Sequence, residues 1–537
     1  MRSISKFAGF IGLTVLLAPF SLAGTIAGTV KGPDGAPFEG AFVQAQNTKT
    51  RITVSVLSDR GGRYRVEHLP GGDYEVRVKA IGFKSDPRRG VNLTADQHAS
   101  LEFALQKGMV HWNDLSLYQG KQLLPDAKGK ETLFGVCSAC HGFESRMASV
   151  TRDESGWRDR VNYMVTTMHF FIGGVGRFTD QNQDEVVSYL NSAFGPESTL
   201  PRSPAELPKY QEVKLGPFSD EAMKIVYVEY DLPGPNRMPW SASPDAHGNF
   251  WMPYYGAANK IGRLDPNTGE VQEFPAPNQG TAAIHSVVPA PDGSVWFTEQ
   301  GSNKIGKWDP KTQEITEYQD AYAPGKEGTV AGGSKHTLRI EPNGEIWATG
   351  GPLSRFDPKT AKFTDIPEVP SAYGIALDKE GQVWFAEFKP NGEIGKVDPR
   401  TLQVTKWAPP TPDARPRRLQ IDSDGIVWFA EFQGGKIGRF DPKTETFKEY
   451  QLPGAEPTPY ALGIDRDHSI WYSSEHMDVI GRLDPKTGQV TEYPFPHSEN
   501  TMREFFLDSQ GRMWFASPAN NKVGYFYVVG SEEHASK

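Results

Sequence analysis

A tryptophan recurs along the second half of the chain at a nearly constant interval, and this repeat limits the fold more than any other feature. The seven positions are Trp251, Trp296, Trp347, Trp384, Trp428, Trp471 and Trp514, spaced by 45, 51, 37, 44, 43 and 43 residues. Each repeat continues with a strand like Lys436 to Pro442 and another that ends like Glu449 to Pro453. Four short strands per repeat, repeated seven times, predict a seven-bladed β-propeller.

The two ends of this repeat region are expected to meet. The seventh repeat stops after its third strand, at Val523 to Phe526. Residues Val228 to Pro233 match the fourth strand of the repeat, although they precede the first tryptophan. We therefore expect this segment to complete the last blade, since a gap would leave an exposed sheet edge. The propeller is predicted over residues 225–528, after a linker at 201–224.

Residues 24–107 form a separate unit of short alternating apolar and polar runs, interrupted by Gly and Pro. This pattern predicts a small antiparallel β-sandwich. The series Gly28-Thr29-Val30, Ser58-Asp59, Leu69 to Tyr74 and Gly82-Phe83 resembles the carboxypeptidase regulatory-like domain. The resemblance implies a carbohydrate-binding-like fold. The alternative is a spacer or docking module without a ligand, and no aromatic cluster marks a sugar platform.

Residues 108–200 have helical periodicity around one short motif. A helix expected after Thr179 carries apolar residues at helical spacing and stops at Gly195-Pro196. Cys137-Ser138-Ala139-Cys140-His141 is the covalent attachment pattern for c-type haem. Its two thiols add to the haem vinyl groups, and His141 is placed as an axial ligand of the iron. An α-helical cytochrome c domain binding haem c is therefore predicted.

The second axial ligand is expected among the residues that follow His141. Methionine together with histidine suits electron transfer, because it raises the reduction potential. The run Trp157-x3-Val161-x2-Met164 resembles a class of small bacterial c-type cytochromes, and this resemblance implies Met164 as the ligand. Met168, one helical turn further on, is the alternative.

The first 23 residues predict a Sec-type signal peptide and a periplasmic or secreted protein. Arg2 and Lys6 precede an apolar stretch, and small residues follow at Ser21 and Ala23. Export agrees with haem attachment, which occurs outside the bacterial cytoplasm. No second apolar stretch is long enough to span a membrane. The balance of 57 Lys+Arg against 66 Asp+Glu, without a long basic run, excludes a general nucleic-acid binder.

One end of the propeller channel is expected to be lined by polar and aromatic groups. The residue eleven before each tryptophan opens the first strand of its blade, and we call these seven residues the mouth ring: Trp240, His285, His336, Tyr373, Arg417, Tyr460 and Arg503. The residue three after each tryptophan ends the second strand on the same face. That series includes Glu299, Glu387 and Glu431, with Glu475 beside its sixth member. Convergent groups of this kind predict a site, whereas polar blade tops that only confer solubility are the alternative.

The repeat resembles the virginiamycin B (streptogramin) lyase family over about 300 residues, through its Trp-Phe-x-Glu, Lys-Ile-Gly-Arg and Glu-Tyr-x-Leu-Pro elements. The resemblance implies a histidine general base and a Mg²⁺ ion held partly by glutamate, which together open a cyclic depsipeptide by elimination. His285 and Glu299 reproduce the family's fourteen-residue step from histidine to glutamate. The best match to the catalytic blade carries Arg417 where the base belongs, and arginine cannot act as a base near neutral pH.

Three functions follow from these features. The first is an exported electron-transfer protein, in which the propeller oxidises a small substrate or docks a donor and the haem exchanges electrons with another cytochrome or respiratory component. The second is an elimination lyase, with His285, Glu299 and His336 as catalytic candidates; a His285/Glu299 or His336/Glu475 pair is placed to hold Mg²⁺ or move a proton. The third is a protein that binds carbohydrate polymer or cell-surface material. The specificity of the Cys137–His141 motif favours the first.

Overall fold

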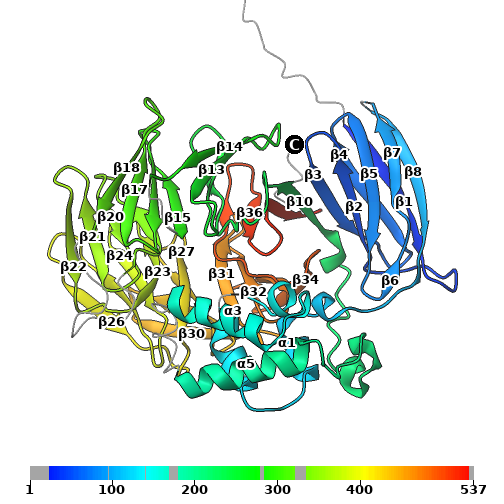
Figure 1. Ribbon diagram of the computed structural model, residues 1–537. Helices are drawn as coiled ribbons and strands as arrows, with labels where there is room; N and C mark the ends of the chain where they lie inside the picture. Colours follow the sequence, from blue (N-terminus) through cyan, green and yellow to red (C-terminus); the bar gives the residue numbers. More distant parts are fainter. Residues whose placement is uncertain are drawn as a thin grey trace, which may run out of the picture.

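The computed structural model describes residues 23–94, 96–139, 141–167, 179–277, 283–320 and 334–530. The chain is mainly β, with a propeller, a sandwich beside it and a group of helices packed below both (Figure 1). The predicted signal peptide lies, except for Ala23, outside the described residues. Among the residues described, no helix is both long and apolar enough to cross a membrane.

The N-terminal sandwich is built from short strands with an alternating burial pattern. Its strands are β1 (Gly24–Lys31), β2 (Phe42–Asn47), β3 (Ile52–Leu57), β4 (Arg63–Leu69), β5 (Gly72–Lys79), β6 (Phe83–Lys84), β7 (Arg88–Leu93), β8 (His98–Ala104) and β9 (Gln106–Lys107). One sheet has the order β4-β1-β8, and the facing strands run β3-β2-β5-β7. Ile26, Val43 and Val76 are fully buried between the two layers. The alternation therefore buries one face of each strand, as expected for a sandwich.

The helical segment consists of α1 (Leu117–Leu123), α2 (Lys130–Gly135), α3 (Glu154–Thr167) and α5 (Asp180–Phe194), with short turns η1 (Trp112–Asp114), η2 (Cys137–Ala139) and η3 (Glu144–Ala148). Thr179 caps α5, because its hydroxyl accepts the backbone N–H of Asn182. Trp157 on α3 and Val186 and Leu190 on α5 are buried in the core of this segment. The linker continues through η4 (Pro204–Glu206), η5 (Pro208–Gln211) and η6 (Ala222–Lys224).

Seven four-stranded blades make up the described propeller. The first three are β11 (Ser243–Pro244), β12 (Phe250–Pro253), β13 (Lys260–Leu264), β14 (Val271–Pro275); β15 (Ile284–Pro289), β16 (Val295–Glu299), β17 (Lys304–Trp308), β18 (Ile315–Gln319); and β19 (Leu338–Ile340), β20 (Ile346–Ala348), β21 (Leu353–Asp357), β22 (Lys362–Ile366). The next three are β23 (Ala372–Leu377), β24 (Val383–Glu387), β25 (Ile394–Val397), β26 (Val404–Trp407); β27 (Pro416–Ile421), β28 (Val427–Glu431), β29 (Lys436–Asp441), β30 (Thr446–Gln451); and β31 (Pro459–Ile464), β32 (Ile470–Ser474), β33 (Val479–Leu483), β34 (Val490–Pro494). The last blade has β35 (Phe506–Leu507), β36 (Met513–Ser517), β37 (Lys522–Val528) and β10 (Ile225–Asp231).

Six of the seven repeat tryptophans donate to a carboxylate six residues earlier. The indole N–H of Trp384 donates to Asp378 at 2.8 Å, and that of Trp428 donates to Asp422 at 2.9 Å. The same bond forms in four other blades, with Asp245, Glu341, Asp465 and Asp508 as acceptors. The ring is thus fixed by the hairpin turn before it, and it packs toward the next blade, as Trp514 does on Phe250.

The last blade is closed by β10, from the N-terminal side of the propeller. β10 pairs with β37 in antiparallel register, from Ile225 opposite Val528 to Asp231 opposite Lys522. The other edge of β10 pairs with β3 of the sandwich, with Val228 opposite Val54. One eight-stranded sheet therefore runs from the last blade into the sandwich, an extension that the repeat pattern does not predict.

Candidate functional site

The mouth ring residues come together around the channel, each in contact with the member from the next blade. The contacts around the ring, as distances between ring centroids or from guanidinium carbon to centroid, are Trp240–His285 4.9 Å, His285–His336 3.6 Å, His336–Tyr373 4.3 Å, Tyr373–Arg417 5.3 Å, Arg417–Tyr460 3.5 Å, Tyr460–Arg503 4.7 Å and Arg503–Trp240 4.4 Å. The circle is closed, so one side chain from each blade contributes to a single continuous surface.

A recurring irregularity of the first strand aims these residues into the channel. In four blades the pairing between the first and second strands shifts at the position of the mouth ring, for instance between Ile284 and Val287 and between Pro416 and Leu419. A bulge of this kind redirects side chains and often lies beside a site. Because of the shift, Arg417 and its neighbour Arg418 are both buried in the channel.

One carboxylate beside the mouth ring pairs with both of its arginines. Glu475 lies 3.4 Å from Arg417 and 3.1 Å from Arg503, and all three side chains are almost fully buried. Arg417 also stands over the rings of Phe388 and Phe432 at 4.5 and 4.4 Å. Cation–π contacts of a desolvated arginine are favourable, so this guanidinium is fixed in position.

The two histidines of the mouth ring are held in the neutral form. Burial lowers the pKa of both His285 and His336 well below the usual range, and the charge of Arg418 adds to the shift. The Nδ1 atom of His336 lies 2.9 Å from the hydroxyl of Thr337 and 3.3 Å from that of Thr349. Neutral imidazole can donate and accept a proton.

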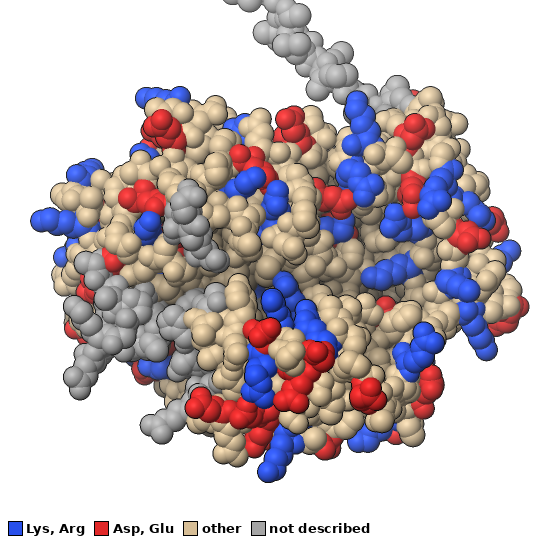
Figure 2. Space-filling view, viewed as in Figure 1, with Lys and Arg blue, Asp and Glu red and all other residues tan. Residues whose placement is uncertain are grey.

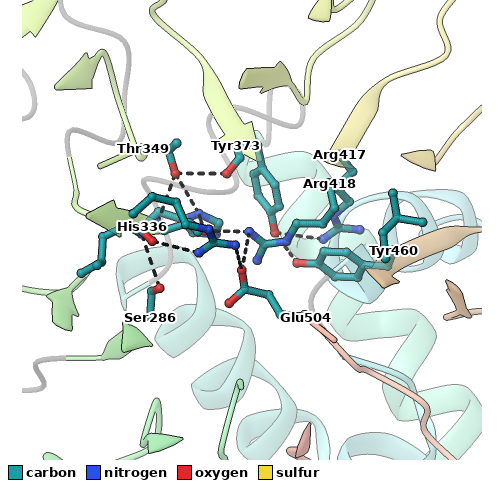
Figure 3. A network of polar contacts seen from close by, with 12 residues as sticks. Ser286, His336, Thr349, Tyr373, Arg417, Arg418, Tyr460 and Glu504 are labelled. Atoms are coloured by element: carbon teal, nitrogen blue, oxygen red, sulfur yellow. Dashed lines mark hydrogen bonds and ion pairs between the residues drawn. The ribbon is translucent and has the colours of Figure 1, made fainter. Parts of the chain in front are cut away.

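The residues that directly follow the mouth ring residues in sequence include three polar side chains that contact one another: Thr337, Arg418 and Glu504. Figure 3 shows Arg417, Arg418, Tyr373 and Tyr460 pointing toward one another, with Glu504 next to Arg418. Arg418 donates to Thr337 at 2.7 Å and lies 3.8 Å from Glu504, whose carboxylate is 2.8 Å from Arg339.

Three of the four glutamates expected beside the mouth ring point elsewhere: Glu299, Glu387 and Glu431. Glu299 accepts from Ser302 at 2.6 Å, and Glu387 pairs with Lys389 and Lys406, each at 3.0 Å. Glu299 stands opposite Ile284 in the sheet, and successive side chains alternate between faces, so His285 is directed to the other side. The His285/Glu299 pairing is therefore not formed, and Glu475 binds arginines where we expected a pairing with His336.

The side chains that meet the mouth ring come one position later, four residues after the tryptophan. Tyr255 stacks on Trp240 with centroids 4.1 Å apart, and Phe388, Phe432 and Glu475 surround Arg417. A shift of one residue reverses the face of a strand. The signal was present in the sequence, because aromatic residues recur at this position.

In two of the glutamates that point away from the mouth ring, the effect of burial on the carboxylate outweighs its favourable contacts. Burial raises the pKa of Glu299 to about 7, and nearby Glu317 contributes. Burial also raises the pKa of Glu431 to about 8, with Glu449 adding to the shift. Over the described ranges, no group of three or more His, Cys, Asp or Glu side chains could hold a metal ion.

His141, from the predicted haem-attachment motif, lies against the propeller. Cys137 is half-buried and packs on the helical core. The Nδ1 atom of His141 is 2.8 Å from the carbonyl oxygen of Gly142. The backbone N–H of Ser145 donates to Glu499 of the propeller at 2.9 Å, and the charges of Glu499 and Arg503 both act on His141.

The structure gives less information on the other residues that we predicted to hold haem. Met164 is half-buried on α3. Cys140 and Met168 lie outside the described residues.

Further contacts fix the helical segment on the propeller. The backbone N–H of Tyr118 donates to the carbonyl of His476 at 2.9 Å, and Lys121 pairs with Glu456 at 2.8 Å. Arg146 reaches the sulfur of Met238 at 3.3 Å. Figure 2 shows basic and acidic side chains intermingled over the visible face of the molecule.

Comparisons with known proteins agree with the β parts of the chain. The Virginiamycin B lyase family model matches residues 220–351 and 361–535, and the Carboxypeptidase regulatory-like domain model matches 25–106. The predicted resemblances to these two families are thereby confirmed, whereas neither matched range includes residues 108–200, so the predicted cytochrome c domain stays a prediction. The predicted haem-attachment motif, residues 137–141, lies outside both matched ranges.

Solved structures give the same result for the propeller. A streptogramin B lyase structure is 27% identical with a TM-score of 0.51, and it covers 58% of this chain and 100% of its own. A virginiamycin B lyase from Staphylococcus aureus is 25% identical with a TM-score of 0.51, and it covers 57% of this chain and 100% of its own. No curated protein matches the chain significantly.

Proposed function

The chain belongs to the virginiamycin B lyase family through its propeller, and we propose that it is an exported c-type haem protein of electron transfer. In this proposal the helical segment carries haem c on Cys137, Cys140 and His141. The propeller oxidises a small substrate or docks an electron donor, and a cytochrome or respiratory component is the redox partner.

The observation that best supports this proposal is the environment of the His141 side chain. Its Nδ1 atom lies at hydrogen-bond distance from the carbonyl of Gly142. A ligating histidine commonly donates its other ring N–H to such a carbonyl, which fixes the tautomer. Nε2 would then be the ring nitrogen of His141 available to hold the haem iron. Cys137 lies in a half-buried position at the edge of an apolar core, which suits a thioether bond to an apolar macrocycle.

The place of the motif on the propeller supports a joint role for the two parts. The loop after His141 contacts Glu499, and the charge of Arg503, a mouth ring residue, acts on His141. Haem c, when bound, supplies a centre that accepts and donates single electrons. The mouth ring contributes aromatic faces and guanidinium groups that can bind and orient a molecule beside it.

The elimination chemistry of the family is the second candidate, and the match over the whole propeller favours it. It needs a base at the catalytic blade, where this chain has Arg417. That arginine is buried against Glu475 and two phenylalanine rings. A group that keeps its proton cannot remove one from a substrate, so electron transfer is the better-supported function.

Covalent haem is the first test. The full chain is expressed in a bacterial host that matures c-type cytochromes, and denatured protein is assayed for bound haem. The wild type and a His111→Ala control, which alters an exposed histidine of the same segment, should retain haem in equal amounts. Cys137→Ala with Cys140→Ala should retain none, and His141→Ala should change the spectrum. Wild-type protein without covalent haem from this host would overturn the proposal in favour of a lyase or a binding protein.

The role of the propeller needs a second assay. Oxidised protein is mixed under anaerobic conditions with alcohols, amines, sugars and aromatic acids, and the ferrous spectrum is followed. Reduction by one class that Arg417→Gln abolishes, and that Arg415→Gln two residues away does not, indicates a substrate-oxidising mouth. Reduction only by another cytochrome indicates a donor-docking propeller.

A further inference from the structure

One carboxyl group of the helical segment is buried where the segment meets the propeller. Glu144, at the start of η3, is 2% exposed. Its Oε2 atom has no hydrogen-bond partner among the residues that the structure describes. A buried carboxylate without partners costs far more free energy than a neutral carboxyl group in the same place. The protonation state of Glu144 therefore bears on how firmly the segment packs against the propeller.

Two carboxylates of the propeller lie next to Glu144. A carbon atom added to Gly142 as a Cβ would overlap Oε2 of Glu144 and lie 3.0 Å from Cγ of Glu499, so both side chains contact one backbone position. The carboxylate of Asp478 accepts the backbone N–H of Glu499 at 3.1 Å. All three acidic residues are at most 9% exposed. We call this buried group the carboxyl joint: Glu144, Asp478 and Glu499.

The members of the carboxyl joint disfavour one another's negative charge. Burial raises the pKa of Glu144 well above its usual range, and the charges of Asp478, Glu499 and Glu475 add to the shift. Burial also raises the pKa of Asp478 to about 7, although two backbone N–H groups that it binds oppose the shift. Glu144 thus stays neutral at a pH at which an exposed glutamate has already ionised.

Basic groups lie near the carboxyl joint, but each has its contact elsewhere. The contacts of these groups are Arg503–Glu475 at 3.1 Å, Arg146–Met238 at 3.3 Å, His141–Gly142 at 2.8 Å and Lys79–Pro496 at 2.9 Å. The charge of Lys79 also acts on Asp478 and lowers its pKa. None of these contacts gives Glu144 a positive partner.

The carboxyl joint holds the helical segment at the edge of the mouth ring. Arg146, two residues after Glu144, reaches Met238, which packs against Trp240 of the ring. Trp240 contacts Arg503 of the neighbouring blade, and these two side chains are 6 and 1% exposed. The segment therefore covers the side of the mouth ring that these two blades form.

We propose that the helical segment is a cover over this side of the mouth ring, which packs against the propeller while Glu144 carries a proton and separates after Glu144 has lost it. In the separated state Glu144 faces water and ionises at about pH 4.3, like any exposed glutamate. Packing of the cover therefore requires the uptake of a proton above this pH. Acid favours the packed state, and the equilibrium shifts toward separation by up to about tenfold per pH unit as the pH rises.

This inference goes beyond the proposed electron transfer and does not depend on it. The carboxyl joint consists of side chains of this chain alone, and its test measures backbone protection. A failure of the haem assay would leave the cover untouched, and a failure of the cover would leave the haem assay untouched.

Hydrogen exchange of the full chain measures the packing of the cover. The protection of residues 141–148 is followed at pH 5, 6, 7 and 8, corrected for the intrinsic effect of pH on exchange. The buried strand β24 is the internal reference. We expect protection of the segment to decrease by up to about tenfold per pH unit while β24 stays protected. The backbone N–H of Ser145, which donates to Glu499 across the joint, is the most direct reporter.

Two variants identify the titrating group. Glu144→Gln keeps the shape of the side chain but cannot ionise, so its segment should remain as protected at pH 8 as at pH 5. Glu131→Gln alters an exposed carboxylate of α2 in the same segment and should follow the wild type. Each variant is compared with the wild type at the same pH, so that the intrinsic exchange rates cancel.

Either of two results would overturn the proposal. One is a corrected protection of the wild-type segment that is the same from pH 5 to pH 8, and this result needs no variant that might fail to fold. The other is a Glu144→Gln protein that loses protection with rising pH as the wild type does, because the group that titrates would then be a different one.

Discussion

The imidazole rings of His285 and His336 pack against each other in the propeller channel with centroids 3.6 Å apart, although they come from different blades. Burial lowers the pKa of each well below the usual range, and Arg418, Arg417 and Arg503 all oppose a further positive charge there. The stacking of two histidines is thus a stacking of neutral rings, and acid should disrupt it.

The histidine pair should make stability depend on pH. Unfolded histidine binds a proton below about pH 6.5, whereas the folded pair resists protonation. The stability that the neutral pair gives the folded state is therefore complete above pH 6.5. This stability decreases as the pH falls, by up to about 1.4 kcal/mol per pH unit for each histidine. Denaturant unfolding of the wild type and of His285→Phe between pH 8 and pH 5 should show a smaller acid loss in the variant. The control His98→Gln, at an exposed histidine, should follow the wild type; equal slopes in all three proteins would contradict the prediction.

Glu431 and Glu387 occupy the same position of neighbouring blades. Replacing each carboxylate by an uncharged amide should nevertheless change the stability of the protein in opposite directions. Burial raises the pKa of Glu431 to about 8, so the folded state holds a proton that the unfolded state has lost, and stability falls as the pH rises from 4.5 through 8. Glu431→Gln should be more stable than the wild type at pH 9, by about 1–3 kcal/mol, with a smaller gain at pH 6.

Glu387→Gln is the comparison, because its carboxylate pairs with two lysines. This variant should be destabilised at pH 9. The measurement is urea unfolding at both pH values, and a loss of stability in Glu431→Gln at pH 9 would show that the carboxylate is better compensated than the contacts indicate.

Removing the charge of Glu475 should be costly. The carboxylate pairs with Arg417 and Arg503, and all three side chains are buried. Glu475→Gln keeps the shape but not the charge, and breaking a buried pair in this way costs about 3–5 kcal/mol. Glu154→Gln affects an exposed carboxylate, paired with Arg158 at 3.2 Å, and should cost less than about 1 kcal/mol. Chemical denaturation at pH 7 compares the two, and similar losses would argue against the strength assigned to the buried network.

Tyr227 connects the sandwich to the propeller and should contribute to the stability of both. Its side chain is fully buried, its ring contacts Phe42 of the sandwich and Phe495, Phe515 and Phe526 of the last blades, and its hydroxyl donates to Pro494 at 2.8 Å. Tyr227→Ala should cost about 4 kcal/mol. Tyr163→Ala, at a half-exposed tyrosine of α3, should stay within about 0.5 kcal/mol. Unfolding monitored by tryptophan fluorescence checks both values.

The repeat could be predicted from the sequence because its tryptophan has a local structural cause. The indole binds a carboxylate six residues earlier in the same hairpin, as in Trp384 and Asp378. Counting back eleven residues from each tryptophan then leads to seven side chains that the structure brings into one ring. A short and regular hairpin keeps this count constant from blade to blade.

The partners of the mouth ring could not be predicted in the same way. Alternation along β28 placed Glu431 beside Arg417, but the bulge in β27 shifts the pairing, and Phe432 takes that place. A pleat of period two makes a shift of one residue a change of face. The contact of the Ser145 backbone with Glu499 could not be predicted from the sequence either. It joins the helical segment to the propeller, and the sequence pattern of each says nothing about the other.

The strand that closes the propeller is an interior strand. In the six other blades the fourth strand is the last of its sheet, whereas β10 has hydrogen-bonded neighbours on both sides. Fraying starts where backbone groups face water, and the slowest hydrogen exchange belongs to strands enclosed by others. The seam of the ring, which in a circular fold is the natural point of failure, is therefore among the last places where this molecule opens.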